Sequence, residues 1–309
     1  MAIAVRSPYF IYEGGGQSYQ IKITINGTLR YTIFKNATLG QFEIAELIRD
    51  YINIAYSGTL SATPETDYVA TVEVYLDVWS SQNGTGTGDV VSTTVLDVDA
   101  VDGYGYFEDG YNHTTPSSNA VLLSNTTIWT PENTTGSFYY VSSSGEITRR
   151  SYLAASTSSS GTGWSVTIKR FPCNKYDPIK LVFVNRFGMP QELWFFAKSV
   201  ESLGATRDRY KSNKLNNNGS YDEEVHQVKT FNANGKIRYS LSTGYISEDY
   251  NEFIQELMLS EQVWAHIGGV VRPVSVLDSD VTYKTSLNDK LVAYTVEIEQ
   301  ANDLISTMR

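Results

Sequence analysis

Residues 181–196 read LVFVNRFGMPQELWFF and contain two apolar runs separated by a short turn-like segment. In each run both alternating positions are apolar, which is typical of strands that are covered on both faces. Asn185 and Gly188 suit the backbone angles of a connection, while Pro190 must lie where no ladder donor is needed. The stretch therefore predicts a central hairpin, and Trp194→Ala is expected to cost about 3–5 kcal/mol of folding stability.

Alternation of apolar and polar residues predicts further hairpins on both sides of this stretch. Residues 18–34 alternate before and after Asn26-Gly27, and that residue pair supplies the positive φ angles of a type I′ turn. Residues 68–79, YVATVEVYLDVW, alternate over their whole length and predict a half-buried strand. In the C-terminal half, hairpins are expected about Asn-Ala-Asn-Gly at 232–235, Gly268-Gly269, and Leu-Asn-Asp at 287–289.

Two segments change from strand-like to helical spacing. Residues 41–55 carry apolar side chains at intervals of three and four, as do residues 247–262, where Ser247 is a candidate N-cap. The expected fold is mainly β, with antiparallel, hairpin-built, sandwich-like domains and one or two short amphipathic helices. The C-terminal half is expected to be α+β, with one helix laid across its strands.

Composition divides the chain into three parts. Residues 1–112 predict an N-terminal β domain, and 113–163 a Ser/Thr/Asn-rich β-excursion or linker. Residues 164–309 predict a C-terminal antiparallel β domain with a helix near 248–261. The softest boundary is AASTSSSGTG at 154–163, because Ser and Gly offer little surface to pack.

Charge and cysteine content exclude several classes of protein. The 309-residue chain has a formal net charge of −10, which argues against a nucleic-acid partner. Its one basic segment, 205–214, contains Arg207 and Arg209 and is interpreted as a solvated loop, with contact to an acidic neighbour as the alternative. A single cysteine, Cys173, excludes an intramolecular disulfide or a multi-thiolate metal site. No secretion signal or apolar run of membrane-spanning length is present, so we expect synthesis in the cytoplasm and no membrane span.

No catalytic constellation emerges from the sequence. His113, His226 and His266 are scattered and match no zinc motif, and no G-x-S-x-G nucleophile motif occurs. The acids of residues 96–110 miss the EF-hand spacing by one residue, which favours a solvated turn over an adventitious Ca²⁺ site. We expect no cofactor, no metal and no enzymatic activity, and a carboxylate-based glycan-degrading enzyme is the lowest-ranked alternative.

Aromatic residues and two arginines supply the candidate functional positions. Aromatic side chains and arginines concentrate at protein interfaces, and tyrosines and tryptophans can also stack on sugars. The candidate interface or packing residues are Trp194, Phe195, Phe196, Arg207, Arg209 and Trp264. The candidate ligand-surface residues are Tyr104, Tyr106, Tyr111, Trp129, Tyr139 and Tyr140.

Residues 181–196, LSEQVWAHIGGVVRPVSV at 259–276 and YKTSLNDKLVAYTVEIEQANDLI at 283–305 resemble virion structural proteins of tailed bacteriophages. The similarity is to proteins of phages with Bacteroidota-like hosts. It covers mainly 175–309, with a weaker likeness in RSPYFI and ELIRDYI near the N-terminus. These patterns determine a fold and carry no catalytic site.

The resemblance implies a non-enzymatic component of the tail, neck or baseplate. Such a subunit assembles in the host cytoplasm, resides in the virion, and binds itself and other virion proteins, here as a homo-oligomeric ring with heterologous contacts. The alternative is a carbohydrate- or receptor-binding module of a tail fibre or adhesin. In that case residues 103–163 would contact a host surface glycan.

Overall fold

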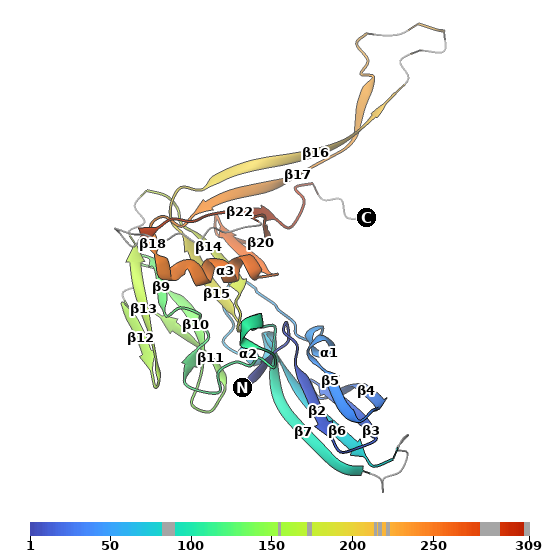
Figure 1. Cartoon of the computed structure of the whole chain (residues 1–309). Helices are drawn as coiled ribbons and strands as arrows, with labels where there is room; N and C mark the ends of the chain where they lie inside the picture. Colours follow the sequence, from blue (N-terminus) through green and yellow to red (C-terminus); the bar gives the residue numbers. More distant parts are fainter. Residues whose placement is uncertain are drawn as a thin grey trace.

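The computed structural model describes residues 1–81, 90–153, 156–171, 175–212, 215, 218–220, 223–278 and 291–305. The fold is mainly β with three short α-helices among these residues, and this confirms the predicted fold class. The five-stranded sheet of the N-terminal part lies at one end of the molecule. A long two-stranded ribbon projects from the other end (Figure 1).

The N-terminal part is a five-stranded sheet of order β1-β7-β6-β3-β4, covered on one face by the β2–β5 pair and α1. The predicted Asn26-Gly27 turn is confirmed, since both residues have positive φ angles. The predicted alternation of 68–79 is confirmed by the burial of every second side chain. The elements are β1 (Ala2–Ala4), β2 (Phe10–Gly14), β3 (Ser18–Ile25), β4 (Thr28–Asn36), β5 (Leu39–Glu43), α1 (Ala45–Arg49), α2 (Pro64–Asp67), β6 (Val69–Trp79) and β7 (Val90–Val101).

The middle part contains two three-stranded sheets, of order β11-β10-β8 and β12-β13-β9. The predicted boundary at 163 lies between β12 and β13, which pair with each other across a tight connection. The division of the chain into three domains therefore stays a prediction. The elements are the 3₁₀ helix η1 (Phe107–Asp109), β8 (Ala120–Val121), β9 (Thr127–Pro131), β10 (Gly136–Val141), β11 (Ile147–Tyr152), β12 (Ser158–Gly161) and β13 (Trp164–Phe171).

The C-terminal part is a seven-stranded sheet of order β15-β14-β19-β20-β22-β17-β16. The predicted Gly268-Gly269 turn is confirmed by positive φ angles at both glycines, whereas the turn expected at 287–289 lies outside the described residues. The elements are β14 (Ile179–Val184), β15 (Pro190–Phe195), β16 (Val200–Lys211), β17 (Val228–Ser242), β18 (Ile246–Ser247), the 3₁₀ helix η2 (Glu248–Tyr250), α3 (Asn251–Leu259), β19 (Val263–Ile267), β20 (Val270–Val276), β21 (Leu291–Val292) and β22 (Thr295–Gln300).

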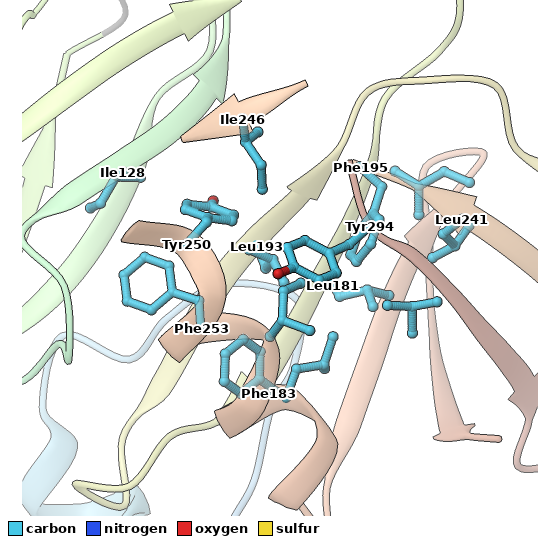
Figure 2. Packing of buried hydrophobic residues seen from close by; sticks show 14 of the residues in the cluster. Ile128, Leu181, Phe183, Leu193, Phe195, Leu241, Ile246, Tyr250, Phe253 and Tyr294 are labelled. Atoms are coloured by element: carbon cyan, nitrogen blue, oxygen red, sulfur yellow. The ribbon is translucent and has the colours of Figure 1, made fainter. Parts of the chain in front are cut away.

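Helix α3 covers one face of the β14–β15 hairpin and joins it to the middle part. Figure 2 shows Tyr250 and Phe253 between the hairpin residues Leu181 and Leu193 on one side and Ile128 of β9 on the other. The helix expected near 248–261 is confirmed. Its apolar face is buried because the sequence places those side chains three and four residues apart.

The opposite face of β14 is buried as well. Val182 packs in a second cluster with Tyr68 and Val101 from the N-terminal part and Tyr139 from the middle part. The prediction that β14 is covered on both faces is confirmed. The hairpin is not central, however, because β15 forms the edge of the seven-stranded sheet.

Asn185 fixes the turn between β14 and β15. Its side-chain oxygen accepts hydrogen bonds from the backbone N–H groups of Phe187 (3.0 Å) and Met189 (3.2 Å). Its amide group donates to the carbonyl of Leu122 (2.8 Å) and to Gln191 (3.0 Å). Both the oxygen and the NH₂ group of this buried side chain therefore have hydrogen-bond partners, as is usual for buried polar groups.

The same turn docks against the chain that leaves β7. The backbone N–H of Tyr104 donates to the carbonyl of Arg186 (2.8 Å). Gly188 has a φ of +75°, and a Cβ there would lie 2.8 Å from the Cβ of Val101. Glycine is therefore required both by the backbone conformation and by the close approach.

Strands β16 and β17 form the long ribbon that leaves the body of the molecule (Figure 1). We call residues 203–211 and 228–237 the arm. Two local predictions are wrong here: residues 205–211 are a strand rather than a loop, and Asn-Ala-Asn-Gly lies inside β17 rather than in a turn. Neither Asn234 nor Gly235 adopts positive φ, because β16 offers extended pairing over twelve residues.

Burial differs between neighbouring aromatic residues of β15, and their contributions to stability should differ accordingly. Phe195 is completely buried whereas Trp194 is half-buried, with the ammonium of Lys180 5.7 Å from its ring centre. We expect Phe195→Ala to lower the free energy of unfolding by about 3–5 kcal/mol. For Trp194→Ala we now expect about half of that, because less apolar surface returns to water.

Urea denaturation of the two variants and the natural protein measures both differences. A Trp194→Ala variant that loses as much stability as Phe195→Ala would contradict this assignment.

Candidate interaction surface

The arm exposes strand edges and both faces. Every residue of β16 is exposed except Gly204, which is half-buried. Strand β16 is the edge of the seven-stranded sheet, and β17 pairs with β22 only from Arg238 to Ser242. From Val228 to Ile237, β17 has no strand of the described residues on its other side. At Gly235, however, the carbonyl accepts a hydrogen bond from the N–H of Leu304 (2.7 Å).

One face of the arm is basic. Because side chains two residues apart lie on the same face of a strand, Arg207, Arg209 and Lys211 share a face with Leu203. Their cross-strand partners are uncharged. They are Ile237, Ala233, Thr230 and Val228, and between them Ala205 lies opposite Gly235. We call this the basic face. The basic face lies on the same side of the sheet as the buried side chains of Tyr239 and Leu241.

The opposite face of the arm carries Asp208 and Tyr210. The side-chain amide of Asn232 donates to Asp208 (2.9 Å), and the rings of Tyr210 and Phe231 lie 6.0 Å apart. Phe231 is the extra residue of a β-bulge opposite Asp208/Arg209. A bulge and alternating charges are features that natural proteins use to prevent uncontrolled pairing of edge strands.

A groove of about 870 Å³ lies where the arm leaves the body. Lys236 and Arg238 approach the carboxylate of Glu299 at 3.2 and 2.7 Å, and Arg238 holds the pKa of Glu299 below its usual value. The amide of Asn234 donates to Asp303 (3.2 Å). Lys236 and Arg238 are thus paired with Glu299, and Asp303 is bound by Asn234. The groove is therefore the place where these contacts attach the arm to the body.

The sequence-predicted interface residues do not form one surface. Arg207 and Arg209 are exposed on the arm, whereas Phe195 is in the core. Phe196 stacks on Phe171 with ring centres 3.6 Å apart. Trp264 packs on Tyr56 (5.3 Å) and so serves intramolecular packing, and the half-buried Trp194 has the ammonium of Lys180 near its ring.

The sequence-predicted ligand residues are also divided between places. Tyr104 and Tyr106 come together with ring centres 5.9 Å apart, and the guanidinium of Arg6 lies 5.0 Å from the Tyr104 ring. Tyr111 is 60% exposed and contacts Phe10.

The remaining three ligand candidates belong mainly to packing. Tyr139 is only 1% exposed, so no ligand reaches its ring, and its hydroxyl donates to the carbonyl of Ser61 (3.0 Å). Trp129 packs against the main core and Tyr140 against Trp164. A continuous aromatic surface over residues 103–163 is therefore not present among the described side chains.

A smaller hollow of about 470 Å³ opens beside Tyr106, Arg186 and Gln255. Behind it, Glu256 of α3 is completely buried, accepts a hydrogen bond from Ser124, and lies 3.8 Å from the Nε of Arg186. Burial raises the pKa of Glu256 to about 7, and the Ser124 hydroxyl and Arg186 act in the opposite direction.

The histidines and acids of the described residues do not form a metal site. Within the described ranges, no three His, Cys, Asp or Glu side chains gather as ion ligands. His266 is engaged by the hydroxyl of Tyr56 at 2.6 Å, and burial lowers its pKa to about 4. No helix among the described residues has the length and apolarity needed to cross a bilayer.

Comparisons with family models, with curated proteins and with solved structures give no match to this chain. Its function must therefore be argued from its own surfaces. The arm is the largest feature that sequence reasoning missed. A signal was present in the alternation of basic residues at 207, 209 and 211, which is strand-like, but the polar composition favoured a loop.

Glu256 makes stability depend on pH. Because the folded protein favours the protonated carboxyl, the free energy of unfolding should fall as pH rises from 4.5 to about 7, by on the order of 3 kcal/mol. Glu256→Gln keeps a neutral acceptor and removes this loss, so the variant should be more stable than the natural protein at pH 8.

Urea denaturation between pH 5 and 8 tests this expectation. Glu65→Gln, an exposed substitution on α2 that is not among the causes of the Glu256 pKa shift, is the control. If Glu256→Gln shows the same pH dependence as the natural protein, Glu256 is not the group responsible.

Proposed function

We propose that this protein is a non-enzymatic structural subunit of a tailed-phage virion, and that it assembles through its arm. The observation that carries the proposal is the projecting ribbon, whose β16 edge and charged side chains Arg207, Arg209 and Lys211 are left uncovered by the described residues. The proposed partners are further copies of the same chain and other virion proteins. The proposed location is the virion, after assembly in the host cytoplasm.

The physical argument starts from the marginal stability of an isolated ribbon. Two strands without a third layer bury too little apolar surface to be stable by themselves in water. Here Leu203 and Phe231 are 61% and 67% exposed, and Val228 is 52% exposed. A partner that covers these side chains provides the missing burial, since interfaces gain most of their free energy from a few well-covered anchors.

The assignment to a phage virion rests on the likeness of residues 175–309 to virion structural proteins. The whole arm lies within this range, as does the hairpin that positions it. Head-to-tail contacts of one surface with a different one close into a ring if the rotation between copies permits. We therefore propose a homo-oligomeric ring in the tail, neck or baseplate.

A receptor-binding module is the second candidate, favoured by the exposure of two aromatic side chains in residues 103–163. Phe107 is 97% exposed and Tyr111 is 60% exposed. A glycan array probed with the natural protein and with Phe107→Ala/Tyr111→Ala distinguishes the two functions. Specific glycan binding that the double substitution removes would favour the receptor module.

Removal of the arm tests the assembly function. Residues 205–234 are replaced by one asparagine, so that Asn-Gly235 forms a two-residue turn between the paired residues Gly204 and Lys236. Tyr239 and Leu241 keep their core positions. We expect a folded monomer for this variant, and for the natural protein we expect oligomers in sedimentation velocity and rings in electron microscopy.

The control for this experiment is the midpoint of thermal unfolding at a protein concentration where the natural chain is monomeric. It should be nearly unchanged, because the removed residues contribute little to the core. A truncated chain that still assembles like the natural protein would refute assembly through the arm.

A further inference from the structure

The five-stranded N-terminal sheet has an outer face that the described residues leave uncovered. Its inner side chains are buried under β2, β5 and α1, whereas the alternate positions of β6 and β7 face outward. Tyr75 and Val95 on this face are 38% and 55% exposed and lie opposite each other in the β6–β7 ladder. We call this surface the outer face.

Acidic residues lie beside these apolar ones. Glu73 of β6 is directly opposite Asp97 of β7, and Asp99 follows two residues later on the same face. Like charges at directly opposed positions of a sheet destabilise it. The nearby cation Lys22 is already paired with Asp77 at 3.0 Å, and in the described part of the chain Glu73 and Asp97 form no ion pair.

The arrangement of these acids points to an extended cationic partner. They do not converge as metal ligands do, since the described residues contain no such group. They are spread along strands at the two-residue spacing of about 6.8 Å. Burial raises the pKa of Asp99, and the positive N-terminus acts in the opposite direction.

The basic face of the arm has the matching pattern. Arg207, Arg209 and Lys211 repeat at the same two-residue spacing, and Leu203 continues this row toward the body. On β7, Asp97 and Asp99 follow the exposed Val95 at this two-residue spacing, whereas on the arm Ala205 separates Leu203 from Arg207. Each surface therefore has an apolar part followed by a charged part, and the charges are of opposite sign.

The two surfaces cannot meet within one molecule. The arm and the N-terminal sheet lie at opposite ends of the chain's fold (Figure 1). A ribbon laid on a sheet buries side chains from both, and the small exposed residues Ala205 and Ala233 permit close approach. The complementary surface must belong to another copy.

We infer that the basic face of the arm of one copy binds the outer face of the N-terminal sheet of the next copy. This inference rests on the proposed assembly function and names the surface that receives the arm. Arg207, Arg209 and Lys211 would pair with Glu73, Asp97 and Asp99, while Ala205 would lie over Val95 with Leu203 beside it. Contact of two different surfaces produces head-to-tail assembly.

Charge reversal tests the pairing. One variant carries Arg207→Glu, Arg209→Glu and Lys211→Glu, and a second carries Glu73→Lys and Asp97→Lys. Each alone should raise the dissociation constant of self-association by at least about tenfold, because like charges then face each other. A mixture of the two, or one chain carrying all five changes, should assemble again.

Matched controls change the same charges at other exposed places. Lys229→Glu alters the arm on its opposite face, and Glu65→Lys alters α2 outside the outer face. Both should assemble like the natural protein. Circular dichroism and thermal unfolding establish that every variant is folded.

A milder pair of changes separates binding from folding. Glu73→Gln with Asp97→Asn removes the opposed charges, so the monomer should unfold at a higher temperature while self-association weakens several-fold. A merely structural role for these acids would not move the two readouts in opposite directions.

The outcomes distinguish this inference from the proposed function. Restored assembly in the mixture supports the arm-to-sheet contact. If the reversed variants assemble like the natural protein while arm removal abolishes assembly, the arm works on another surface and the inference is wrong. If arm removal also has no effect, the proposed function itself fails.

Discussion

The structure depends on the buried amide of Asn185, which joins three parts of the chain at one turn. It closes the β14–β15 turn, holds the backbone of Leu122 from the middle part, and positions Arg186 to accept from Tyr104. An unsatisfied buried donor or acceptor costs about 1–3 kcal/mol, so these groups stay together. Around the turn, α3 and the second core cluster complete the packing.

This arrangement fixes two distant surfaces relative to each other. The seven-stranded sheet that carries the arm includes β14 and β15, and their turn is docked on the chain leaving β7 of the N-terminal sheet. In a head-to-tail assembly the geometry between the two contact surfaces of one copy determines how successive copies rotate. In the head-to-tail assembly that we propose, a fixed geometry between these surfaces would favour one closed ring over a range of curved chains.

Sequence reasoning succeeded where local chemistry decides the structure. Asn26-Gly27 forms its turn because both residues accept positive φ, and the covered faces of β14 follow from a run of apolar residues. It failed where pairing with a segment distant in the sequence decides the local conformation. Asn234-Gly235 has the composition of a turn but pairs with Thr206 and Ala205.

The candidate site shows the same division between local and distant causes. The basic alternation of the arm is visible in the sequence, yet its exposure depends on how far β16 and β17 extend past β22. Tyr139 has the composition of a ligand residue and is buried by Tyr68, 71 positions earlier, with ring centres 6.1 Å apart. Parallel pairing of β1 with β7 and of β9 with β13 likewise has no local signal.

The contact between the arm of one copy and the outer face of the next is tested most directly by zero-length carbodiimide cross-linking. The assembled protein is mixed from isotopically light and heavy copies. This chemistry joins an amine to a carboxylate only when the two are in contact. We predict links between Lys211 of one copy and Glu73 or Asp97 of another, detected as light–heavy peptide pairs by mass spectrometry. Links from Lys211 only to other carboxylates, or only within one copy, would contradict it.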